Sequence, residues 1–131
     1  MTDLDLDPIR AALSRGGTID ITTTGRTSGL PRRIEIVFHR IDGRIWISGM
    51  PSPRKRAWLA NLEADSRLTF HLKGPLATAD LPARARIVED EAERRTILER
   101  VARAWNRTDL DRMVVYSPLI EVTIDEGALA A

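Results

Sequence analysis

Three consecutive cations, Arg54, Lys55 and Arg56, stand just before a stretch with the apolar spacing of a helix. Positive side chains are unfavourable at the start of a helix, where the backbone dipole already presents positive charge. An anion bound by the helix amides and by these three side chains would compensate for that charge. The alternative is that the three side chains extend into water, and the local pattern favours neither interpretation.

A second polar segment, over residues 22–32, reads Thr-Thr-Thr-Gly-Arg-Thr-Ser-Gly-Leu-Pro-Arg. Glycine, serine and proline at this density predict a turn. Taken by itself, the composition of the segment favours a polar hairpin turn in which Arg26 and Arg32 are solvated.

Composition excludes several kinds of catalytic site. The 131 residues contain no cysteine, which excludes disulfides, thiolate nucleophiles and zinc sites built on cysteine. Two histidines, His39 and His71, leave little for a metal site, and we expect none. The chain also lacks the glycine-lysine motif of a phosphate-binding loop and the Gly-x-Ser-x-Gly motif of a serine hydrolase.

Charge and hydropathy limit the partners. Twenty Lys and Arg residues face 19 Asp and Glu residues, for a net charge of +1. We therefore expect no general attraction to nucleic acid. No apolar run approaches the roughly 18 residues that a membrane span needs. The acidic first residues lack the apolar region of a signal peptide, so the expected location is the cytoplasm.

The periodicity of apolar residues predicts one domain over residues 1–131, in which strands outnumber helices. The pattern over residues 106–116 indicates neither a helix nor a strand, and the tail over residues 126–131 is expected to fray. The expected helices cover residues 7–15, 54–64 and 89–107, and the expected strands cover residues 18–24, 32–41, 44–48, 67–73, 77–88 and 118–125.

Strands that follow one another along the chain favour antiparallel pairing. We therefore expect an α+β fold that is mainly β, with six antiparallel strands in a small barrel or coiled sheet. Two or three helices would cover its openings. Phe38, Trp46 and Phe70 could belong either to the core or to an interface between copies of the chain.

Together, residues 22–32 and residues 58–62 resemble the deazaflavin-dependent nitroreductase family. The family carries Thr-Thr-Thr-Gly-Arg-x-Ser-Gly-x-x-Arg near its N-terminus, and Trp-x-x-Asn-Leu in a helix that follows a loop of small residues. Both motifs occur here in the same order and at matching spacing, and the resemblance covers about residues 18–125.

The resemblance implies a split β-barrel like that of flavin-binding relatives of pyridoxamine-phosphate oxidase. It implies the deazaflavin coenzyme F-420 as hydride donor, and a quinone, a nitro compound or an activated alkene as acceptor. Basic residues would hold the phosphate and the oligoglutamate tail of the coenzyme, and residues 48–50 would lie beside its ring. The residues implied to bind the coenzyme are Arg26, Ser28, Arg32, Ser48, Gly49, Met50, Arg54, Lys55, Arg56, Trp58 and Asn61.

Such an enzyme needs little acid–base machinery of its own, because the coenzyme carries the hydride chemistry. Tyr116, the only tyrosine, is the candidate catalytic residue as a donor of a proton or hydrogen bond to the substrate. The alternative is a buried aromatic residue before the last strand.

Two departures from the family pattern keep other functions open. Nitro-reducing members are rich in tyrosine, and the family's usual Gly-Gly pair is replaced here by residues 50–53, Met-Pro-Ser-Pro. The prolines stiffen the loop and remove amide donors. The alternatives are an FMN- or haem-binding split barrel and a non-catalytic ligand-binding module of the same fold. A homodimer could form through a face of the sheet.

Overall fold

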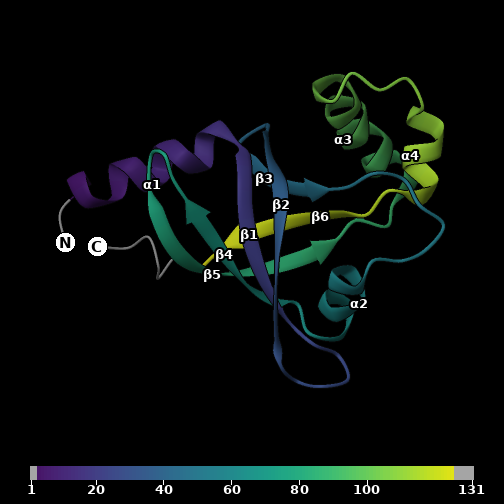
Figure 1. Cartoon of the computed structure of the whole chain (residues 1–131). Helices are drawn as coiled ribbons and strands as arrows, with labels where there is room; N and C mark the ends of the chain where they lie inside the picture. The colour runs from purple at the N-terminus through teal and green to yellow at the C-terminus, as the bar shows by residue number, and fades with distance from the viewer. Residues whose placement is uncertain (1–2, 126–131) are drawn as a thin grey trace.

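Six antiparallel strands close into a barrel, as Figure 1 shows. The computed structural model describes the backbone of residues 3–125 and the side chains of residues 8–125. The strands follow one another around the barrel in the order β1-β2-β3-β6-β5-β4. They are β1 (Gly17–Thr24), β2 (Pro31–Ile41), β3 (Arg44–Ser48), β4 (Arg67–Lys73), β5 (Thr78–Ile87) and β6 (Leu119–Ile124). The predicted fold class, a mainly β protein built on six antiparallel strands, is confirmed.

Within the described residues, four helices accompany the barrel, whereas the sequence predicted two or three. They are α1 (Asp3–Arg15), α2 (Ala57–Ala64), α3 (Glu91–Ala104) and α4 (Leu110–Tyr116). The additional helix, α4, occupies the segment whose pattern indicated no element, and α1 begins earlier than residue 7. The expected fraying of residues 126–131 lies outside the described residues. No helix in the described part of the chain is long and apolar enough to cross a membrane.

The start of α2 was predicted wrongly, because the helix begins at Ala57 and not at Arg54. Arg56 is the residue before the helix, and its backbone is extended (φ −71°, ψ 144°). Further upstream, the hydroxyl of Ser52 accepts a hydrogen bond from the amide of Arg54 (3.2 Å). Such a local bond offers the backbone an alternative to the helix. Arg54 and Lys55 therefore stand on the loop before α2.

A side-chain cap begins α3, and a change of backbone conformation follows its end. Asp90 caps the first turn, where its carboxylate accepts a hydrogen bond from the amide of Glu93 (2.9 Å). At the other end, Asn106 has a positive φ of 55°, a conformation that does not continue a right-handed helix. The helix is therefore shorter than the predicted 89–107.

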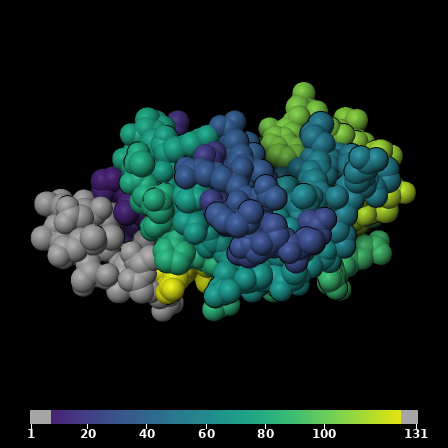
Figure 2. Space-filling view, turned by 60° about the horizontal axis from the view of Figure 1, so that its bottom comes forward, coloured from purple at the N-terminus to yellow at the C-terminus, as the bar shows by residue number. Residues whose placement is uncertain are grey.

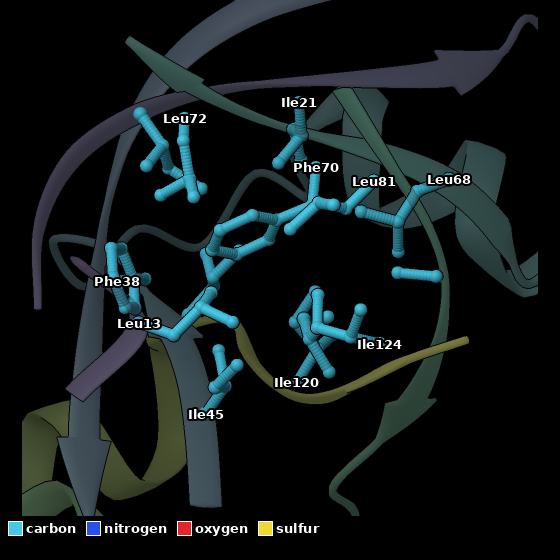
Figure 3. Close-up of a cluster of buried hydrophobic side chains, with 14 of the residues drawn as sticks. Leu13, Ile21, Phe38, Ile45, Leu68, Phe70, Leu72, Leu81, Ile120 and Ile124 are labelled. Carbon is cyan, nitrogen blue, oxygen red and sulfur yellow. The ribbon is translucent and has the colours of Figure 1, made fainter. Parts of the chain in front are cut away.

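Alternation along the strands fills the barrel with apolar side chains, several of which appear in Figure 3. Phe38 and Phe70 meet edge to face at its centre, with ring centroids 5.1 Å apart. Both rings are buried, as are Ile21 and Ile120 from strands on other parts of the wall. Phe38 and Phe70 are therefore core residues of this chain.

A second core lies outside the barrel wall, beneath α3 and α4. Trp46 points outward from β3 into this core, and its indole N–H donates to the carbonyl of Ile41 (3.3 Å). It packs with Leu98 of α3 and Met113 of α4, which are both fully buried. Trp46, which could have belonged to an interface between copies of the chain, is thus also a core residue.

His39 lies on β2 at the edge of this second core, beside Trp105 (ring centroids 5.2 Å apart). Its Nε2 atom is buried and has no hydrogen-bond partner among the described residues. Burial lowers the pKa of His39 because the charged imidazolium would lose its hydration. The folded protein therefore holds this side chain neutral below the pH at which an unfolded chain would protonate it.

This arrangement predicts a loss of stability in acid. As pH falls below about 6.5, the unfolded chain binds a proton at His39 that the folded chain resists, so the free energy of unfolding decreases. His39→Phe, which keeps an aromatic ring beside Trp105, should lose less stability than the wild type between about pH 7.5 and pH 5. Urea unfolding at the two pH values measures the difference. An equal loss in both proteins would show that His39 does not contribute.

Candidate functional site

The two sequence segments that carry the family resemblance meet at one buried side chain, Asn61 of α2. Its Oδ1 atom accepts hydrogen bonds from the backbone amide of Arg26 (3.1 Å) and from the guanidinium of Arg26 (3.0 Å). Its Nδ2 atom donates to the hydroxyl of Thr23 on β1 (3.1 Å). Asn61 is 3% exposed, and its bond to Thr23 is buried, whereas the two bonds to Arg26 are partly buried. They fix α2 against the end of β1 and the loop that follows it.

That loop, residues 25–30, is held in one conformation by its own hydrogen bonds. The amide of Gly25 donates to the carbonyl of Leu30 (2.8 Å), and the hydroxyl of Ser28 accepts from the amide of Leu30 (3.1 Å). A Cβ atom on Gly25 would lie 2.5 Å from that hydroxyl, so a larger residue here would displace the Ser28 side chain. Figure 2 shows this loop in dark blue across the front of the molecule.

A first groove, of about 740 Å³, lies between the loop and α2. Its lining includes five of the residues that the resemblance assigns to the coenzyme, two of them arginines. Trp58 lines the groove and also packs into the barrel core, so it serves as a wall. The five residues are Arg26, Ser28, Arg32, Trp58 and Asn61.

A second groove, of about 350 Å³, lies beyond the start of α2 and is bounded by the end of α4. Arg54, Lys55, Arg56 and Tyr116 line it. The ammonium group of Lys55 pairs with Glu63 (2.7 Å), whereas the guanidinium of Arg54 has no carboxylate partner among the described residues. The cations of the two grooves thus stand on either side of one helix start.

The segment that joins β3 to α2 is attached to the start of β6. The hydroxyl of Ser48 is buried and donates to the carbonyl of Pro118 (2.7 Å). A Cβ atom on Gly49 would lie 3.1 Å from Pro118 and 3.2 Å from the guanidinium carbon of Arg56, so the backbone passes close to both side chains. The next residue, Met50, is 54% exposed.

Tyr116 ends α4 and lies at the edge of the second groove. It is 42% exposed, so the alternative of a buried aromatic residue is wrong. The guanidinium of Arg112 stacks over its ring, 5.3 Å from the centroid. The carbonyl of Tyr116 accepts a hydrogen bond from the amide of Ser52 (3.3 Å), which connects α4 to the loop before α2.

Sequence reasoning missed Arg94, the residue that holds α4 in place. Its guanidinium donates to the carbonyls of Val88 (2.9 Å), Val114 (2.9 Å) and Ser117 (2.6 Å). The last carbonyls of a helix lack partners within the helix, and Arg94 supplies them. Burial lowers the pKa of its guanidinium. The sequence signal that could have identified Arg94 is its position one turn before Leu98, which places a cation on the apolar face of α3.

Another chain of hydrogen bonds has the residue types of a hydrolytic triad but not its setting. His71 bonds to the hydroxyl of Thr22 (2.7 Å) and to the carboxylate of Asp80 (2.7 Å), which link β1, β4 and β5. Thr22 lies within the barrel wall, where it pairs with Arg33 of β2 on one side and with Thr69 of β4 on the other. We interpret the chain as a lock between strands.

Other features of the described residues support neither a metal site nor a third coenzyme groove. No group of three or more His, Cys, Asp or Glu side chains in the described part of the chain could hold a metal ion. A larger hollow, of about 840 Å³, lies on the other side of the loop from the first groove. None of the predicted coenzyme residues is among the described residues that line it.

Fold and grooves together define the class of protein: a split-barrel protein with two grooves lined by cations. The model of the F420H(2)-dependent quinone reductase family matches residues 9–126, and the chain belongs to this family. The predicted resemblance to the deazaflavin-dependent nitroreductase family is thereby confirmed as membership of an F420H(2)-dependent reductase family, one named for quinones and not for nitro compounds. A search of curated proteins finds no significant match.

Solved structures share the fold at low sequence identity. A conserved hypothetical protein from Mycobacterium tuberculosis is 20% identical, with a TM-score of 0.71 over 95% of this chain and 81% of the other. An F420-H2 dependent reductase is 19% identical, with a TM-score of 0.58 over 82% of this chain and 94% of the other. A protein described as a domain-swapped dimer is 20% identical, with a TM-score of 0.60 over 85% and 82% of the two chains.

The contacts of Asn61 predict a stability defect when its amide is removed. Asn61→Ala would leave the hydroxyl of Thr23 and the amide of Arg26 without their partner, at a cost of about 2 kcal/mol in the free energy of unfolding. Thr23→Val removes only one of the three bonds and should cost less, about 1 kcal/mol. Urea unfolding of both variants gives the comparison. A smaller loss for Asn61→Ala than for Thr23→Val would contradict the role of Asn61 as the shared acceptor and donor.

Proposed function

We propose that the protein transfers a hydride from the reduced deazaflavin coenzyme to a small organic acceptor. One observation carries the proposal: cations of two grooves flank a single helix start, with Arg26 and Arg32 in the first groove and Arg54 and Lys55 in the second. Membership of the F420H(2)-dependent quinone reductase family supports the same coenzyme.

The residues present fit the chemical parts of that coenzyme. Arg54 and Lys55 would hold its phosphate, since guanidinium and ammonium groups form strong charge-assisted hydrogen bonds with phosphate oxygens. Arg26 and Arg32 would meet the carboxylates of its tail along the first groove. Residues 48–50 would lie beside the ring, on a backbone that the side chains of Arg56 and Pro118 contact at Gly49. Trp58 and Asn61 form the wall and the support of the first groove.

A quinone is the acceptor that we propose first, because the matching family is named for quinone reduction. When bound, the coenzyme supplies a hydride, which carries two electrons to the acceptor. One proton then completes the reduction of a quinone to a quinol. Tyr116, half-exposed at the edge of the second groove, would donate that proton or bond the quinone oxygen. Nitro compounds and activated alkenes are the other acceptors to test.

Coenzyme binding tests the proposal directly. Titration of F-420 with the protein, followed by quenching of the coenzyme's fluorescence, should show saturable binding. Arg54→Ala/Lys55→Ala should weaken that binding at least about tenfold, because each cation contributes charge-assisted hydrogen bonds.

The control for this titration is Arg100→Ala/Arg103→Ala, which removes the same charge from α3. It should bind the coenzyme like the wild type. Absence of binding by the wild type at high micromolar coenzyme would overturn the proposal. If both double variants bound the coenzyme equally weakly, the effect would arise from the net charge of the protein and not from the positions of Arg54 and Lys55.

A second experiment tests the role of Tyr116. Tyr116→Phe should lower the rate of quinone reduction about a hundredfold, the usual scale for loss of a positioned proton donor. Its affinity for the coenzyme should stay unchanged, and Val115→Ala, at the neighbouring exposed position, should keep full activity. If Tyr116→Phe reduced the quinone at the wild-type rate, Tyr116 would take no part in the reaction.

We also propose that the protein forms a homodimer, on the ground that a protein with a similar fold is described as a domain-swapped dimer. Sedimentation at micromolar concentration would give the mass. The cytoplasmic location stays a prediction of the sequence.

A further inference from the structure

Arg56 differs from the two cations before it in what its guanidinium contacts. Its Nη2 atom donates to the carbonyl of Met50 (2.5 Å). Its guanidinium carbon and Nη2 atom both lie 3.2 Å from the point where a Cβ atom on Gly49 would stand. The side chain is therefore packed over the backbone of residues 49 and 50.

The loop that follows β3 has few other attachments. Residues 51 and 53 are prolines, which carry no amide hydrogen with which to anchor the loop. Ser48 bonds to Pro118 at the base of the loop, and the amide of Ser52 bonds to the carbonyl of Tyr116 further along. Between these two points, the hydrogen bond from Arg56 attaches the backbone, and the sulfur of Met50 accepts another from the guanidinium of Arg107 (3.1 Å).

We infer that Arg56 is a positioning residue, which fixes the backbone of Gly49 and Met50 for the coenzyme ring and does not grip the anionic tail. The inference rests on the proposed function and deepens it. A charged donor to a carbonyl makes one of the stronger hydrogen bonds in a protein. Arg56 is partly buried, whereas Arg54 is exposed. Burial also lowers the pKa of the Arg56 guanidinium.

Two measurements separate positioning from direct anion binding. The first is amide hydrogen exchange in the protein without coenzyme. Arg56→Ala should release the loop and speed exchange at the Ser52 amide about tenfold. Arg54→Ala, which removes a neighbouring cation and leaves the Met50 contact intact, should leave that exchange unchanged.

The second measurement is coenzyme affinity at low and high salt. Salt screens interactions between exposed charges but affects the order of a loop much less. Arg56→Ala should therefore weaken F-420 binding by about the same factor, roughly tenfold, at both salt concentrations. The loss caused by Arg54→Ala should shrink at high salt.

A variant that keeps every charge gives an independent check. Gly49→Ala places a methyl group against the guanidinium of Arg56 and the ring of Pro118, so the contact must shift. It should reproduce the faster Ser52 exchange of Arg56→Ala, and combining the two changes should add little, because both disrupt the same contact.

The inference would be overturned if Arg56→Ala left Ser52 exchange unchanged, or if its effect on affinity vanished at high salt. Wild-type exchange in Gly49→Ala would also count against it. The exchange experiment needs no coenzyme. If the wild type fails to bind F-420, the proposed function fails, while the exchange rates still decide whether Arg56 holds the loop.

Discussion

The buried amide of Asn61 is the contact on which the geometry of the site depends. Through three hydrogen bonds it joins α2 to β1 and to the loop after β1, which lie 35 to 38 residues earlier in the sequence. A buried amide is costly unless its donors and acceptors are paired, so these elements are constrained to one arrangement. Both grooves follow from it, since each has the start of α2 as a wall.

A second set of contacts brings α4 to the same place. Arg94 gives its donors to backbone carbonyls at the end of α4 and near the start of α3, and so fixes Tyr116 at the edge of the second groove. The arginines around the site therefore have two different roles. Some, such as Arg54, face solvent without a carboxylate partner among the described residues, whereas Arg94 and Arg56 are partly buried and hold backbone in position.

Much of the fold could be predicted because its strands alternate strictly. The pattern of β4 and β6 specifies which side chains enter the barrel, and the structure places Phe70 and Ile120 there. The start of α2 could not be predicted from apolar spacing, since the Ser52 hydroxyl turns the chain at Arg54. α4 was missed because a helix of seven residues carries little periodic signal, and its support comes from Arg94 on another helix. The motifs pointed to residues that line the grooves. The separate role of Arg56 could not be predicted, because it depends on a contact with the carbonyl of Met50 that the spacing of residues in the sequence does not reveal.

The central claim is that this chain uses a reduced deazaflavin to deliver a hydride. The most direct test mixes the protein with one equivalent of reduced F-420 and then with excess menadione, a simple quinone, and follows the absorbance of the oxidised coenzyme. Our account predicts oxidation of the coenzyme in a single turnover, with one quinol formed per coenzyme, far faster than the same mixture without protein. A rate equal to that of the protein-free mixture, with menadione and with nitro and alkene acceptors alike, would contradict it.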